Sequence, residues 1–164
     1  MSRVPASRRS GCGWTSTPGA GYTPSMSHTI ITYDDARHRD RVMALWREIF
    51  GYPSAYNDPA FAIDRKIAVD DLFWVAEADE AVFGTVMAGY DGHRGWIYSM
   101  AVAPDQRGKG LGSRLLDHAI EALKRRGCVK VNLQILESNE AVRRFYEANG
   151  FTVEPRLSMG RVLD

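Results

Sequence analysis

The sequence has little cysteine and no apolar run of the roughly 20 residues that a membrane-spanning helix requires. Its two cysteines are Cys12 and Cys128, and no histidine, cysteine or acidic cluster has metal-ligand spacing. The formal net charge of +1 argues against a general nucleic-acid or membrane binder. We therefore expect a protein of the reducing cytoplasm, with no metal, no structural disulfide, no membrane and no nucleic-acid partner.

Acidic residues are absent from the first 25 residues, which are rich in serine, glycine, proline and arginine. This segment has no apolar core of a secretory signal, and its poor helical amphipathicity argues against a transit peptide. We expect residues 1–25 to be a disordered extension, while translation from Met26 is an open alternative. Residues 26–164 are then a single domain, long enough to bury a core.

The hydrophobic patterning from Thr29 onward predicts an α/β domain with a mixed, mainly antiparallel sheet. Tight turns such as Asp91-Gly92 join three apolar runs into an antiparallel meander. A helix between the next two strands makes those strands parallel neighbours. Predicted strands cover 29–33, 72–77, 81–90, 96–103, 129–136 and a final hairpin of 151–153 and 157–162; predicted helices cover 35–50, 59–69, 111–126 and 139–149.

Helix caps and buried faces follow from the same patterning. Asp34 or Asp35, Asp58 and Ser138 are in position to cap three of the helices. Apolar residues at helical spacing mark two buried faces: Val42, Leu45, Trp46 and Ile49 in one helix, and Leu111, Leu115, Leu116, Ala119 and Leu123 in another. The aromatic loop with Tyr52 and Tyr56 either covers a substrate or only packs between two helices.

A glycine-rich loop, Gln106 to Ser113, joins an apolar strand to an amphipathic helix. This order presents backbone N–H groups at the positive end of a helix dipole, where phosphate binds. The loop lacks the Gly-Lys-Ser/Thr of a Walker motif, and Gly108, Gly110 and Gly112 are too closely spaced for G-x-G-x-x-G. A purely structural loop is the alternative.

The run Arg107-Gly108-Lys109-Gly110-Leu111-Gly112 resembles the Q/R-x-x-G-x-G/A motif of the GCN5-related N-acetyltransferases, the GNAT family. Met100 to Pro104 resembles the fourth strand of that family, and the blocks 137–141 and 145–151 resemble its later motif. The resemblance covers residues 29–163. The stretch 84–95 and Asn57-Asp58-Pro59 further resemble the small bacterial YpeA-like branch.

This resemblance implies an acetyl-CoA-dependent N-acetyltransferase whose central sheet has splayed fourth and fifth strands. The acceptor would be a small-molecule or protein amine, and a homodimer is compatible with the family. A non-catalytic acyl-CoA-binding regulatory module is the alternative. The implied acetyl-CoA contacts are Met100, Ala101 and Val102 for the pantetheine arm, Arg107, Gly108, Lys109, Gly110, Leu111, Gly112 and Ser113 for the pyrophosphate, and Asn139 for the cofactor arm.

The resemblance also implies direct attack of the amine on the thioester in a ternary complex. Tyr146 matches the general acid of the family, and a core tyrosine is its alternative. Gln134 occupies the position at which some relatives have a glutamate on the fifth strand, and glutamine cannot accept a proton at neutral pH. Conceivable bases are Glu48, Asp58, Glu77, His93 and Glu137, each with a solvated surface role as alternative. Tyr98 and Trp96 either border the acceptor site or pack in the core, and Cys128 reads as a small buried hydrophobe rather than a nucleophile.

Overall fold

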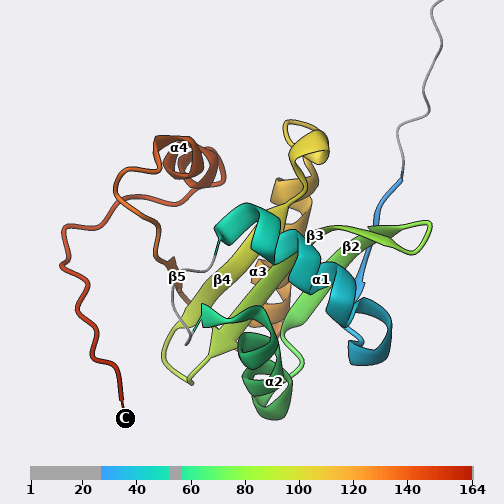
Figure 1. The fold of residues 1–164 in the computed structure, drawn as a ribbon. Coiled ribbons are helices and arrows are strands. Elements are labelled where there is room, and N and C mark those ends of the chain that lie inside the picture. The colour runs from blue at the N-terminus through green and yellow to red at the C-terminus, as the bar shows by residue number, and fades with distance from the viewer. Residues whose placement is uncertain (1–26, 52–56, 164) are drawn as a thin grey trace, which may run out of the picture.

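Five strands form one sheet in the order β1-β2-β3-β4-β5 in the computed structural model, which describes residues 27–51 and 57–163 (Figure 1). The first three pairings are antiparallel and the pairing of β4 with β5 is parallel. This confirms the mixed, mainly antiparallel sheet. The extension 1–25, Tyr52 and Tyr56 lie outside the described residues. The strands are β1 (Thr29–Thr32), β2 (Phe73–Ala78), β3 (Ala81–Tyr90), β4 (Gly95–Val102) and β5 (Val131–Leu133).

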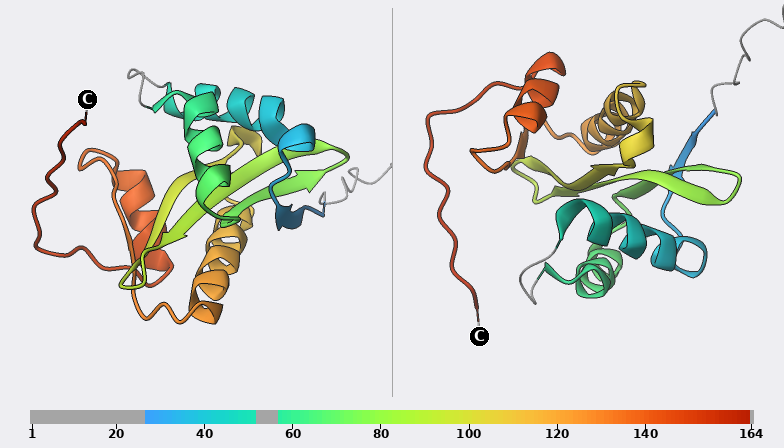
Figure 2. Two further views of the ribbon diagram at one scale, coloured as in Figure 1. Left: turned by 90° about the horizontal axis from the view of Figure 1, so that it is seen from below. Right: turned by 45° about the horizontal axis from the view of Figure 1, so that its top comes forward.

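The helices cover both faces of the sheet. Figure 2 shows α1 (Asp35–Phe50) and α2 (Pro59–Val69) on one face and α3 (Leu111–Arg125) on the other. The last helix, α4 (Glu140–Ala148), lies beyond β5. None of the helices in the described part of the chain is long and apolar enough to cross a membrane.

Two apolar layers, one on each face, hold these helices to the sheet. Beneath α3, the side chains of Leu115, Leu116 and Leu123 are fully buried against residues of β2, β3 and β4. On the opposite face, Val42 and Trp46 of α1 are fully buried against the sheet. Burial of each large aliphatic side chain contributes roughly 1.5–3 kcal/mol. Both predicted helix faces are therefore confirmed, with Ile49 only partly buried.

The C-terminal third departs from the sequence-based expectations. β5 spans Val131–Leu133 only, instead of the eight residues from 129 to 136. Asn139, not Ser138, caps α4 by accepting a hydrogen bond from the Val142 N–H at 3.2 Å. The predicted hairpin of 151–153 and 157–162 is absent, because neither segment has a strand partner among the described residues. Strand propensity alone does not supply that partner.

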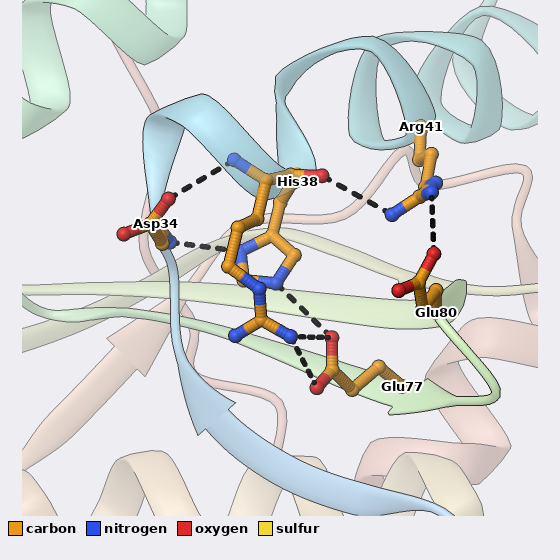
Figure 3. Close-up of polar contacts among 6 residues, drawn as sticks. Asp34, His38, Arg41, Glu77 and Glu80 are labelled. Atoms are coloured by element: carbon orange, nitrogen blue, oxygen red, sulfur yellow. Dashed lines mark hydrogen bonds and ion pairs between the residues drawn. The ribbon is translucent and has the colours of Figure 1, made fainter.

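A buried histidine ties the start of α1 to the end of β2 (Figure 3). The Nδ1 atom of His38 accepts a hydrogen bond from the Asp34 N–H at 2.8 Å. Its Nε2 atom lies 3.1 Å from the carboxylate of Glu77, which also binds the guanidinium of Arg37. Both ring nitrogens therefore have a partner, and the Nδ1 contact places the ring proton of the neutral form on Nε2.

Replacing His38 with leucine tests this link. The substitution leaves the Asp34 N–H without its partner, so we expect the free energy of unfolding to fall by about 2 kcal/mol. Urea denaturation measures the change. The control is Arg41→Ala, because Arg41 makes two exposed contacts, a 3.6 Å ion pair with Glu80 and a 3.3 Å hydrogen bond to the Arg37 carbonyl, and their loss should stay within about 0.5 kcal/mol. Equal stability of the two variants would contradict a structural role for His38.

Candidate active site

The N-terminus of α3 has no side-chain cap. Its N-cap residue is Gly110, whereas Asp34, Asp58 and Asn139 cap α1, α2 and α4. The first-turn N–H groups of a helix have no partner inside the helix. The N–H groups at Leu111, Gly112 and Ser113 of α3 are thus available to an anion.

Positive φ angles shape the loop that leads into this helix. Gly108 has φ +72° and Gly110 has φ +80°, and a Cβ atom at either position would meet nothing within 4 Å. The left-handed conformation, rather than crowding, is what favours glycine at both positions. The backbone therefore stays open to a ligand on this side.

Cations surround the loop, and the first turn of α3 has no acidic residue. Arg114 donates a hydrogen bond to the His28 carbonyl at 2.8 Å, and Lys109 lies 3.5 Å from the Gln106 side chain. Burial, together with the positive field of Arg114 and Lys109, lowers the pKa of His28. The loop thus combines free N–H donors with positive charge.

A bulge interrupts β4 at Ser99 and Met100. Thr85 of β3 pairs with Ala101 whereas Met87 pairs with Tyr98, so β4 has one extra residue in this interval. Ser99 adopts φ +48°, which is unusual for a residue with a side chain. The bulge also reverses the side of the strand to which the odd-numbered N–H groups point. Before the bulge, the Gly95 N–H donates toward β5; after it, the Ala103 N–H donates to the Phe83 carbonyl of β3.

Two hydrogen bonds, one buried and one partly buried, hold the bulge in place. The Nε1–H of Trp46 donates to the Oγ1 of Thr85 at 2.8 Å. The Thr85 hydroxyl in turn donates to the carbonyl of Ser99 at 3.0 Å. Trp46 and Thr85 are both fully buried, whereas Ser99 is partly buried, so water is excluded from the bond between Trp46 and Thr85. Helix α1 thereby fixes the backbone of β4 through one threonine.

The edge of β4 beyond the bulge is open toward β5. The pairing of the two strands ends at Ile97 and Leu133, so that no strand among the described residues pairs with residues 98–102 on that side. The side chain of Arg107 donates to the Val102 carbonyl at 3.2 Å, so the glycine loop lies against this edge. The structure thus confirms the predicted splay and brings the backbone at Met100, Ala101 and Val102 next to the loop.

Tyr146 of α4 faces the same edge. Its hydroxyl lies 3.5 Å from the Sδ atom of Met100, and its ring packs edge-on against Phe145 and Phe151. Burial raises the pKa of Tyr146 to about 12. Asn139 is exposed at the start of α4, where its side-chain oxygen serves as the cap.

Gly112 has a packing role in addition to its place in the motif. A Cβ atom there would lie 3.1 Å from the Phe145 ring of α4. The last glycine of the motif therefore lets α3 and α4 approach each other closely, which helps to bring Tyr146 toward β4.

Comparison with known proteins identifies the family. The sequence model of the acetyltransferase (GNAT) family matches residues 39–151. This chain belongs to the GNAT family. It is 39% identical over 125 residues to an acetyltransferase of Yersinia enterocolitica, across 76% of this chain and 88% of the relative. An acetyltransferase of Yersinia pestis is 38% identical over 139 residues, and the match covers 84% of this chain and 96% of that relative.

A solved structure shares the fold of this N-acetyltransferase. The aminoglycoside N-acetyltransferase AAC(6')-Iy, in complex with the bisubstrate analogue CoA-S-monomethyl-acetylneamine, superposes with a TM-score of 0.68 at 18% identity. The match covers 84% of this chain and 99% of the other. At this identity the likeness concerns the fold alone.

The conceivable bases of this acetyltransferase are scattered. Glu77 is bound by Arg37 and His38, and Asp58 caps α2. The remaining three are exposed: Glu48, His93 and Glu137. Gln134 donates a hydrogen bond to the Ser158 hydroxyl at 2.5 Å. No hydrogen bond or ion pair in the described part of the chain brings any of them to the open edge of β4.

Sequence reasoning missed a polar cluster beside Tyr98. Lys66 of α2 is buried, forms an ion pair with Asp70 at 2.5 Å, and lies 5.7 Å from the Tyr98 ring centroid. The Tyr98 hydroxyl lies over Gly89, where a Cβ atom would be only 2.0 Å away. Burial lowers the pKa of Lys66 and raises the pKa of Tyr98.

Two further candidate residues lie near β5. Trp96 is partly buried and lines the groove beside that strand. Cys128 is buried and its thiol donates to the Lys130 carbonyl at 3.2 Å. This position agrees with its interpretation as a small buried hydrophobe.

Replacing Thr85 with valine tests the support of the bulge. Valine keeps the shape but has no hydroxyl, so the Trp46 N–H and the Ser99 carbonyl both lose their partner. We expect the free energy of unfolding to fall by about 1–3 kcal/mol, and acetyl-CoA to bind more weakly. Urea denaturation and calorimetric titration measure the two effects. Thr32→Val, at an exposed position of β1, is the control and should change neither.

Proposed function

We propose that this chain transfers an acetyl group from acetyl-CoA to a primary amine by direct attack in a ternary complex. The observation that carries the proposal is the uncapped N-terminus of α3 next to the open edge of β4. Free N–H donors with positive charge suit a pyrophosphate. An unpaired strand edge suits an extended amide-containing arm, which can pair with it as an additional strand.

The donor would then lie along two connected surfaces. The N–H groups from Gly108 to Ser113, with Arg107 and Lys109, would hold the pyrophosphate. The backbone at Met100, Ala101 and Val102 would pair with the pantetheine arm, because Val102 presents its polar groups to the open edge. Asn139 would contact the arm from the start of α4 through its amide nitrogen, since its oxygen is the helix cap.

The chemistry needs a free amine, donors for an oxyanion and an acid for the leaving sulfur. The amine nitrogen bonds to the thioester carbon, the oxygen becomes negative, and the C–S bond then breaks to leave a thiolate. Backbone N–H groups beside the bulge are the proposed donors, worth about 3 kcal/mol when well placed. The proposed acid is Tyr146, whose hydroxyl approaches β4 at Met100.

The acceptor would be a small-molecule or protein amine that enters beside Tyr98. This residue precedes the bulge and is partly exposed, between the sheet and α2. Gln134 cannot accept the proton of the amine, and Glu77 and Asp58 are engaged in structural contacts. We therefore expect this proton to leave through water.

Substitutions at Gly110 test the placement of the phosphate. Asparagine and aspartate have the same shape and both tolerate φ near the +80° of Gly110. Only Gly110→Asp places a negative charge at the α3 N-terminus, so we expect its affinity for CoA to fall about 10-fold or more below that of Gly110→Asn. Isothermal titration measures both. Equal affinities in the two variants would show that the phosphate lies elsewhere.

Replacing Tyr146 with phenylalanine tests the acid. We expect kcat for acetyl transfer to fall by about 100-fold, with little loss of stability because the Met100 contact is weak. Thiol release across a panel of amines measures the rate. Wild-type protein that binds acetyl-CoA but acetylates no amine of the panel would instead support the regulatory acyl-CoA-binding module.

The pH profile gives a second test of Tyr146. Its pKa of about 12 lies above the ordinary 10.0, so the phenol stays protonated, and able to donate, up to about pH 10. The associated contribution to stability is fully present below about pH 10 and is lost as the pH rises through about 12. A fall in kcat between about pH 7 and pH 9 that disappears in Tyr146→Phe would contradict this assignment.

A further inference from the structure

The hydroxyl of Tyr146 has a weak hydrogen-bond partner. Tyr146 is only 8% exposed, and among the described residues its hydroxyl donates to the Sδ atom of Met100 alone, at 3.5 Å. A thioether sulfur is a weak acceptor, whereas a buried tyrosine hydroxyl usually finds a full hydrogen-bond partner. The proton of Tyr146 is therefore held loosely, and a stronger acceptor at Met100 would hold it more tightly.

Met100 lies where the bulge, the open edge and α3 meet. It follows Ser99 in β4, and no strand among the described residues pairs with residues 98–102 on the β5 side. Its terminal methyl group lies 3.6 Å from the place that a Cβ atom of Gly112 would take. The Met100 side chain is partly buried rather than enclosed. It is thus held against α3 and lies beside an edge that no described strand closes.

The other described methionines lack this combination. Met87 is 3% exposed within the apolar layer beneath α1, and Met43 packs against the same layer. Met159 is 93% exposed, and no hydrogen bond joins it to another described residue. Among the described methionines, only Met100 combines partial exposure with a contact to the proposed acid.

We propose that Met100 is a site of reversible oxidation that switches the activity off. Hydrogen peroxide gives one oxygen atom to Sδ: the O–O bond breaks, an S–O bond forms, the sulfur loses two electrons and the second oxygen leaves as water. The product is methionine sulfoxide, a polar side chain whose oxygen is a strong hydrogen-bond acceptor. Methionine sulfoxide reductase reverses the step, since two thiols form a disulfide and the sulfoxide oxygen leaves as water.

The sulfoxide oxygen would compete with the leaving thiolate for the proton of Tyr146. The 3.5 Å between Sδ and the hydroxyl oxygen suits a phenol that donates to an oxygen bonded to that sulfur, since an O–H···O bond is about 2.7 Å long and bends at the acceptor. The proton would then point to Met100 instead of the sulfur of acetyl-CoA. This consequence rests on the proposed function, in which Tyr146 is the acid, whereas the oxidation of Met100 does not.

Peroxide treatment, followed by peptide mass mapping and an acetyl-transfer assay, tests the switch. We expect Met100 to gain one oxygen atom, kcat to fall about 10-fold, and the reductase to restore the rate. Met100→Leu should keep, after treatment, the rate that it had before treatment. Met159→Leu is the matched control, because it removes an exposed methionine that makes no contact with Tyr146; it should lose activity on treatment as the wild type does.

Three results of this experiment would overturn the switch. Met100 could stay unoxidised while the exposed Met159 reacts. The rate could survive the complete oxidation of Met100. Met100→Leu could lose its rate on treatment to the same extent as the wild type, which would place the sensitive residue elsewhere.

Melting temperatures test the contact without any measurement of activity. In the wild type the sulfoxide oxygen accepts a hydrogen bond from Tyr146, but in Tyr146→Phe this donor is missing. Oxidation should therefore lower the Tm of the variant by about 3 °C more than the Tm of the wild type. An equal fall in both proteins would overturn the contact and with it the switch. If the variant shows the larger fall but the untreated wild type acetylates no amine, the proposed function is wrong and the Met100 contact stands.

Discussion

The two hydrogen bonds that run from Trp46 through Thr85 to the carbonyl of Ser99 set the geometry of the candidate site. A left-handed backbone at a residue with a side chain costs about 1–3 kcal/mol. Losing the Thr85 hydroxyl would leave the buried Trp46 N–H and the partly buried Ser99 carbonyl without this partner, and a buried unpaired polar group costs about 1–3 kcal/mol. The two bonds are thus of the size needed to hold the strained conformation of Ser99. Without the bulge, the N–H groups of β4 would alternate without interruption, and the Ala103 N–H would point to the β5 side, as the Gly95 N–H does.

Close packing of α3 connects this bulge to the glycine loop. A Cβ atom at Gly84 would lie 2.8 Å from the Leu115 side chain and 3.0 Å from the Ala101 carbonyl. Glycine there lets α3 lie directly on β3 and β4, so its uncapped N-terminus comes to the end of the opened strand. The hydrogen bond from the Arg107 side chain to the Val102 carbonyl also holds the glycine loop against the end of β4. The free amides and the free strand edge are therefore consequences of one packing arrangement.

Local signals in the sequence predicted most of the fold. Asp34, Asp58 and Pro59 specify helix starts through short-range bonds, and these starts match the structure. The length of β5 and the final hairpin depend on strand partners far away in the chain, and those predictions were wrong. The motif indicated the glycine loop and Tyr146. Nothing distinguishes Thr85 from any other strand threonine, because its role arises only when α1 packs over β3 and brings Trp46 to it.

The two surfaces proposed for the donor differ in what they contribute. A polar group on the open edge of β4 that pairs with the ligand gives up a bond to water or, at the Val102 carbonyl, to Arg107, so each exchanged bond gains only about 0.5–1.5 kcal/mol. Bonds between N–H groups and a charged phosphate are about twice as strong, and the helix dipole adds to them. Affinity in the proposed complex therefore comes mainly from the α3 N-terminus with Arg107 and Lys109. The edge of β4 would instead set the direction of the arm and so place the thioester beside Tyr146, which contacts that edge at Met100.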